Sequence, residues 1–214
     1  MASGRVDLIL SPVPADVVYL TANGLGDDKH DLHAIGAGAR VVLRHGSLRH
    51  TVTVQFREDG ESFANYLELN ARLAGRLRLR DSRRYRFDYN ERTKVLSVAP
   101  SPVSSARASA MSSARLNPNT VHIGYELSSV LGMPERRRMP VQLRIGQRTA
   151  KFAVFTPSNL LDRTIRFAPA ALRSLKLTAG TPLALSYNQN TQTLTIAWAT
   201  EKPAPAADKG TGDA

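Results

Sequence analysis

One pattern occurs twice in this chain, at a constant offset of 98 residues. The first copy runs from Leu77 to Ala99 as LRLRDSRRYRFDYNERTKVLSVA, and the second runs from Leu175 to Ala197 as LKLTAGTPLALSYNQNTQTLTIA. Both contain Leu-x-Leu and then Tyr-Asn-x-x-Thr-x-x-Leu-x-x-Ala, and no gap is needed to align them. Because an internal repeat constrains the architecture before any local prediction is made, we expect two copies of one folding unit.

Within each copy, segments with strand and helix periodicity follow one another in a regular order. The second copy indicates strand, short helix, strand and strand, twice over, at residues 120–125, 126–132, 140–145, 150–155, 164–167, 170–175, 182–187 and 193–198. The first copy follows the same plan, except that a glycine-rich stretch at 23–28 replaces its first helix. We therefore predict a mainly β protein with short helices, built as two tandem double-psi-like barrels of pseudo-duplicated β-α-β-β units.

Composition suggests where the copies begin and end. Residues 100–114, PSPVSSARASAMSSA, are rich in Ser, Ala and Pro without an apolar period, which is typical of a flexible linker. Residues 200–214 are small, polar and proline-containing, which indicates a disordered tail. We expect a first barrel over 1–99, a linker over 100–114, a second barrel over 115–199 and the tail over 200–214.

The chain has no cysteine, so we expect its stability to come from packing alone. The apolar run near the N-terminus is too short for a secretory signal, and no segment approaches the ~20 apolar residues of a membrane span. We accordingly expect a soluble cytoplasmic protein without a membrane span.

The net charge of +11 is unevenly distributed. Residues 1–99 hold 15 Lys and Arg against 12 Asp and Glu, whereas residues 115–199 hold 11 against 3. The second copy therefore carries most of the positive field, and such a field favours acidic partners such as nucleic acid, anionic lipid or acidic protein.

The repeat also resembles a known family. The run from Phe167 to Leu177, followed by Tyr187 to Leu194, is similar to the N-terminal β-rich region of the endospore coat-associated ATP-grasp proteins, the YheC/YheD family. The resemblance covers each predicted barrel once, about four fifths of the chain. It implies a place in the spore envelope. The 214 residues contain no counterpart of the ATP-grasp catalytic domain, so no nucleotide chemistry is carried over. More distantly, the predicted units resemble double-psi barrels and the barrels of AbrB-type transcription regulators.

Two features invite a cofactor or metal interpretation. Gly36-Ala37-Gly38 and Asn23-Gly24-Leu25-Gly26 lack the third glycine of a dinucleotide-binding loop, so we expect turns that need positive φ. On a helix, His30 and His33 could bind a divalent ion with Asp27 or Asp31, whereas in a loop these side chains are simply solvated. The glycine-rich context favours the loop, and we expect no metal and no cofactor.

No catalytic signature accompanies the fold. His45, His50 and His122 lie near predicted strands without an obvious nucleophile, and Ser47 lacks an orienting partner for His45. Asn90 and Asn188 recur at hairpin tips, where Asn tolerates left-handed backbone, so we assign them to the fold. We therefore predict that the protein is not an enzyme.

Clustered arginines are the one positive functional signal. Strand alternation predicts that Tyr85, Phe87 and Tyr89 point inward and that Arg84 and Arg86 point outward. This argues against a surface on that strand where the bases of single-stranded nucleic acid could stack, because such a surface needs rings and cations together. The candidate anion-binding or partner-binding residues are Arg83, Arg84, Arg86, Arg136, Arg137, Arg138, Arg144, Arg148 and Lys151.

Two functions remain open on these grounds. The first is a non-enzymatic scaffold or adaptor, associated with the spore coat, that binds a protein or an anionic polymer through the basic second barrel. The alternative is a nucleic-acid-binding regulator of AbrB-like type. Because the predicted β-α-β-β units are alike, two chains could also exchange hairpins, which would give an oligomer.

Overall fold

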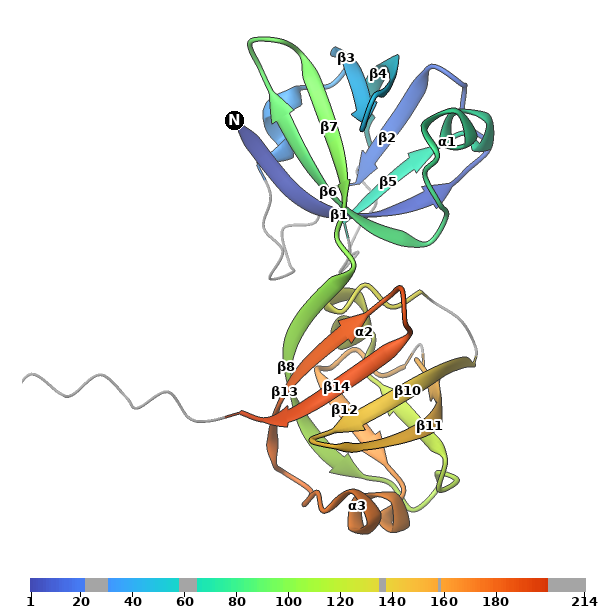
Figure 1. The fold of residues 1–214 in the computed structure, drawn as a ribbon, viewed down its shortest axis with the longest axis vertical. Coiled ribbons are helices and arrows are strands. Elements are labelled where there is room, and N and C mark those ends of the chain that lie inside the picture. The colour runs from blue at the N-terminus through green and yellow to red at the C-terminus, as the bar shows by residue number, and fades with distance from the viewer. Residues whose placement is uncertain (22–30, 58–64, 135–137, 158, 200–214) are drawn as a thin grey trace, which may run out of the picture.

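The computed structural model describes residues 1–21, 31–57, 65–134, 138–157 and 159–199. They form two closed β-barrels of seven strands each, which follow one another along the chain and along the long axis of the molecule (Figure 1). Three short α-helices and one 3-10 helix decorate the barrels. The prediction of a mainly β protein with two small barrels in tandem is thereby confirmed.

The first barrel has the cyclic strand order β1-β5-β2-β4-β3-β7-β6. Its elements are β1 (Ala2–Leu10), β2 (Val17–Thr21), the 3-10 helix η1 (Leu32–Ile35), β3 (Arg40–His45), β4 (Leu48–Phe56), β5 (Tyr66–Leu69), α1 (Ala71–Leu77), β6 (Arg83–Asn90) and β7 (Val95–Pro100).

The second barrel has the equivalent order β10-β11-β9-β12-β8-β13-β14. Its elements are β8 (Val103–Ser112), β9 (Thr120–Ile123), α2 (Tyr125–Val130), β10 (Met139–Ile145), β11 (Arg148–Phe155), β12 (Thr164–Phe167), α3 (Pro169–Leu175), β13 (Pro182–Asn188) and β14 (Thr193–Trp198).

The offset of 98 residues holds in three dimensions. Strand β5 and helix α1 recur as β12 and α3 at that spacing. Both helices end on a left-handed residue of nearly the same conformation, Arg78 at φ 55° and Lys176 at φ 56°. The hairpins that follow carry left-handed Lys94 and Gln192, again 98 apart. The repeat therefore encodes one fold twice, down to single backbone conformations.

The predicted linker is wrong in its structure, because most of it is strand β8 of the second barrel. β8 runs parallel to β12 and antiparallel to β13, and Ser101 and Pro102 alone separate it from β7. Its inward positions are small because the opposing side chains are large: Ser104 lies opposite the buried Tyr187, as Ala2 lies opposite Tyr89 in the first barrel. Small residues facing large ones fill a narrow barrel without an apolar pattern in the sequence.

The first strand of each barrel, β1 or β8, completes a local twofold symmetry between the two units of that barrel. In the first barrel, β4 lies between parallel β2 and antiparallel β3, and β1 lies in the same way between parallel β5 and antiparallel β6. β7 is the seventh strand, between β3 and β6. Thus β1, rather than β7, takes the place equivalent to β4, and the two units are interlocked.

Each barrel encloses its own hydrophobic core. On β6, Tyr85, Phe87 and Tyr89 are buried, as strand alternation predicts. Over the described ranges, no helix is long and apolar enough to cross a lipid bilayer.

The barrels are joined by a polar contact centred on Arg84 and Gln189. The guanidinium of Arg84 binds Asp7 of its own barrel at 2.8 Å and donates to the carbonyl oxygens of Ser129 and Val130, at the end of α2, at 2.6 Å each. Gln189 accepts a hydrogen bond from the Arg84 backbone N–H and donates to the Arg84 carbonyl, both at 2.9 Å. We call this set of bonds the barrel joint.

Candidate functional site: a basic groove on the second barrel

The second barrel carries many more cations than its carboxylates can neutralise. Its carboxylates in the described part of the chain are Glu126 and Asp162, which bind Arg163 at 2.6 Å and Arg166 at 2.7 Å. The remaining cations of its described residues are all exposed and have no described carboxylate partner: Arg107, Arg115, Arg138, Arg144, Arg148, Lys151, Arg173 and Lys176. The surface of this barrel is therefore positively charged.

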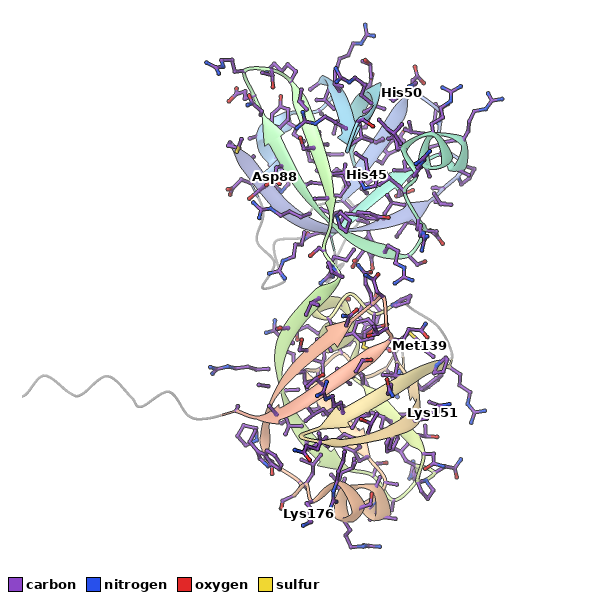
Figure 2. All side chains as sticks on the ribbon, viewed as in Figure 1. His45, His50, Asp88, Met139, Lys151 and Lys176 are labelled. Carbon is purple, nitrogen blue, oxygen red and sulfur yellow. The ribbon has the colours of Figure 1, made fainter. Side chains whose placement is uncertain are left out.

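Several candidate residues from the sequence lie on this surface. Arg144, Arg148 and Lys151 belong to the β10–β11 hairpin, and Arg138 directly precedes it. Figure 2 shows Lys151 on the outer side of the hairpin and Lys176 at the far end of the barrel, beside α3. Arg148 donates to the Ser174 carbonyl at 3.0 Å, which holds it against the end of that helix. Arg136 and Arg137 lie outside the described residues.

The candidate arginines of the first barrel are engaged in contacts within the chain. Arg84 is 4% exposed and its guanidinium is committed to the barrel joint, so its prediction as an anion-binding residue is wrong. Arg83 donates to the Gln189 carbonyl, and Arg86 is paired with Asp88 at 2.9 Å. Alternation correctly points Arg84 away from its own core, but the outside of β6 at that position is covered by the second barrel.

A groove of about 350 Å³ lies where the loop after β8 meets β9 and β11. Arg115, Asn117 and Arg138 border it together with the rings of His122 and Phe155. The two ring centroids are 5.1 Å apart and the rings are tilted by 48°. We call this hollow the basic groove; no local sequence pattern reveals it, because its residues come from separate segments.

The surroundings of His122 favour its neutral form. Burial lowers its pKa below the ordinary 6.5, and the positive charge of Arg166 lowers it further. Arg166 lies directly opposite His122 in the pairing of β12 with β9, and it is held by Asp162. A neutral imidazole has one hydrogen-bond donor and one acceptor, so the groove offers both beside its cations.

The corresponding face of the first barrel has a different character. Strand register places Tyr19, Gln55 and Glu68 at the positions of His122, Phe155 and Arg166. Arg57 lies over the Tyr19 ring, 4.7 Å from its centroid, and is paired with Glu68 at 3.1 Å. In the first barrel an arginine therefore covers the Tyr19 ring and is neutralised by Glu68. In the second barrel the position of Glu68 is taken by Arg166, which is paired with Asp162, and His122 lies beside the Phe155 ring.

Two other hollows offer less chemistry. A cavity of about 280 Å³ between the barrels is bordered by Asp7 and Asp81. Arg84 binds Asp7, while Asp81 accepts hydrogen bonds from the Leu10 N–H at 2.9 Å and the Ser82 hydroxyl at 3.0 Å. A shallow hollow of about 560 Å³ beside Arg144 is lined mostly by neutral polar side chains of β10, β13 and β14.

The other sequence candidates have structural roles. Gly36 and Gly38 adopt φ of 75° and 78°, as expected for turns that need positive φ. His45 Nδ1 lies 2.8 Å from the Leu77 carbonyl oxygen, and His33 stacks on Phe56 at 5.5 Å. No group of three potential metal ligands occurs among the described residues. His30, Asp27 and the stretch Asn23–Gly26 lie outside them.

No family model, curated protein or solved structure matches this chain. The resemblance to the spore coat-associated family therefore stays a prediction.

Proposed function

We propose that the protein is a non-enzymatic binding module whose second barrel holds an anionic polymer against its basic surface. The supporting observation is the charge balance of that barrel: Glu126 and Asp162 are each consumed by an ion pair, while eight exposed cations have no described carboxylate partner. Such a surface attracts a polyanion over several ångströms and gains free energy when counterions are released on contact.

The first barrel serves as the scaffold in this proposal. Its sequence is closer to charge balance, with 15 Lys and Arg against 12 Asp and Glu over residues 1–99, and it is fixed to the second barrel by Arg84. The resemblance to the spore coat-associated family suggests an adaptor in a spore envelope; the alternative location is the cytoplasm.

Salt-dependent binding tests this proposal. Polyphosphate, poly-glutamate and an oligonucleotide would be titrated against the full chain at several salt concentrations. The triple variant R144A/R148A/K151A should weaken binding and flatten the salt dependence, since each lost phosphate contact reduces the slope of log K against log salt by about 0.7 for a single strand. The matched control is R40A/R44A/R49A, which removes three exposed charges from the corresponding hairpin of the first barrel.

The same experiment can contradict the proposal. If no polyanion binds at low salt, or if the two triple variants weaken binding equally, the second barrel is not the binding surface. Circular dichroism of each variant verifies that the barrels remain folded.

The alternative function, a regulator that binds duplex DNA, is favoured by one observation: Arg138 lies directly before an exposed hairpin that carries three further cations. A regulator of this type should prefer duplex over single-stranded DNA and over the other polyanions, with a steep salt slope.

A further inference from the structure

The basic groove brings rings and cations to one surface, which strand β6 does not. On β6 the aromatic side chains are buried inside the barrel. In the groove, Phe155 and His122 border the same hollow as Arg115 and Arg138. Rings and cations on one surface are what a protein needs to bind unpaired bases and their phosphates together.

We propose that the basic groove binds single-stranded nucleic acid, with a base against Phe155 and His122 and backbone phosphates at Arg115 and Arg138. This inference rests on the proposed function and deepens it, since it names the polymer and the place where it binds.

The rings distinguish this ligand from other polyanions. Polyphosphate and acidic peptides could use Arg115 and Arg138, but they have no flat group for Phe155. In duplex nucleic acid the bases are already stacked on one another, so their faces are closed to a side chain. An unpaired base offers an open face, and stacking on an aromatic ring tolerates every base because each has one.

The polar groups of the groove fit the edge of a base. Neutral His122 has one donor and one acceptor, and the Asn117 amide has both. The volume of about 350 Å³ is near the lower end of the roughly 300–1,000 Å³ typical of ligand pockets. That size suits one nucleotide of a strand rather than a folded domain.

The first barrel supplies an internal comparison. At the equivalent face, Arg57 already occupies the Tyr19 ring and Glu68 adds a negative charge. A nucleotide would have to displace that arginine and approach a carboxylate. Because the fold is the same, the difference between the two faces lies in the side chains, and these favour nucleic acid on the second barrel alone.

Fluorescence anisotropy with the full chain tests the inference. The probes are a labelled deoxythymidine oligonucleotide, an abasic strand of equal length, a duplex and polyphosphate. Phe155→Leu should weaken binding of the oligonucleotide about tenfold, within the range for one lost stack, and leave the abasic strand and polyphosphate unchanged. Phe155→Tyr should restore affinity. R115A/R138A should weaken all anionic probes, and the first-barrel control Tyr19→Leu should change none.

Each remaining outcome has a defined meaning. If the abasic strand binds as tightly as the oligonucleotide, or if Phe155→Leu has no effect, the inference is overturned while polyanion binding stands. A preference for duplex also overturns it and favours the regulator. If no probe binds the wild-type chain, the inference and the proposed function both fail. Thermal melting of Phe155→Leu and Phe155→Tyr shows whether a loss reflects unfolding.

Discussion

Two effects lower the pKa of His122. Burial disfavours the imidazolium first, and the positive charge of Arg166 disfavours it further, so the pKa lies below 6.5. In the unfolded chain neither effect remains. Protons therefore bind the unfolded state more readily, and the stabilising contribution of neutral His122 is present above about pH 6.5 and is lost as the pH falls through the folded pKa.

A histidine titration followed by NMR checks this. We expect the His122 midpoint to lie below 6.5 in the wild-type chain. In Arg166→Gln the midpoint should rise yet stay below 6.5, because burial is the larger cause and remains. Unfolding free energies should fall on acidification below about pH 6.5 in the wild type and less steeply in His122→Gln. A midpoint unaffected by Arg166→Gln would contradict the role assigned to this charge.

The contacts of single residues in the site could be predicted from the sequence only in part. Alternation placed Arg84 outside its own barrel, which is right, but it could not show that Ser129 and Val130 of the other barrel would meet it there. Likewise, His122 and Phe155 are 33 positions apart and become neighbours through strand pairing alone. A local pattern specifies which face a side chain takes; what covers that face depends on segments far away in the chain.

At the scale of elements, the helices illustrate two opposite uses of glycine. A Cβ added at Gly124, which precedes α2, would lie 2.0 Å from the backbone oxygen of Asp162, so the glycine allows a close approach of two backbones. Gly75, exposed within α1, has nothing within 4 Å of an added Cβ. The same substitution should therefore have opposite effects at the two sites.

We expect Gly124→Ala to destabilise the chain by about 1–3 kcal/mol, since backbone atoms must move to accept the methyl group. Gly75→Ala should stabilise it by about 0.5–1 kcal/mol, because alanine loses less backbone freedom in a helix. Denaturant unfolding of both variants measures the difference. Equal effects would show that the contact at Gly124 does not constrain α2.

Strand β8 shows why a strand can be missed when structure is predicted from sequence patterns. The repeat predicted β5, α1, β6 and β7 and their counterparts because their apolar residues recur at fixed positions. β8 instead presents Ser104, Ala108 and Ala110 to a crowded core and cannot be told from a linker by composition. Its strand character comes from backbone pairing on both sides, which composition does not record.

Proline substitutions separate a strand from a linker in this segment. Ser109 is exposed, but its N–H donates to the Arg163 carbonyl at 3.4 Å, so Ser109→Pro should cost about 1–3 kcal/mol through the lost bond and disturbed pairing. Ala114 follows β8 at the second position of a turn closed by the Leu116 N–H and the Ser113 carbonyl. Proline is favoured there, so Ala114→Pro should be close to neutral. Two tolerated prolines would indicate that β8 is not part of the barrel in solution.

At the scale of the whole molecule, the barrel joint decides whether two copies of one fold act as one body. A short connection alone would leave two barrels free to reorient. Gln189 is buried, and its side chain binds both the N–H and the C=O of Arg84. Its amide also donates to the Ser101 carbonyl at 3.1 Å. Close packing at the joint is visible at Gly132, where an added Cβ would lie 2.7 Å from Arg84 Nε. These contacts hold the basic groove in a fixed orientation to the first barrel.

Removing the Gln189 side chain should release that orientation without opening either core. Gln189→Ala removes the two side-chain hydrogen bonds to the buried N–H and C=O of Arg84, at a cost of about 1–3 kcal/mol to the joint. The neighbouring exposed Asn190 provides the control, Asn190→Ala. ¹⁵N relaxation should give one rotational correlation time for both barrels in the wild type and in Asn190→Ala, and shorter, separate values in Gln189→Ala. If Gln189→Ala tumbles like Asn190→Ala, then Arg84 and the packing at Gly132 suffice to fix the barrels, and the joint does not depend on the glutamine.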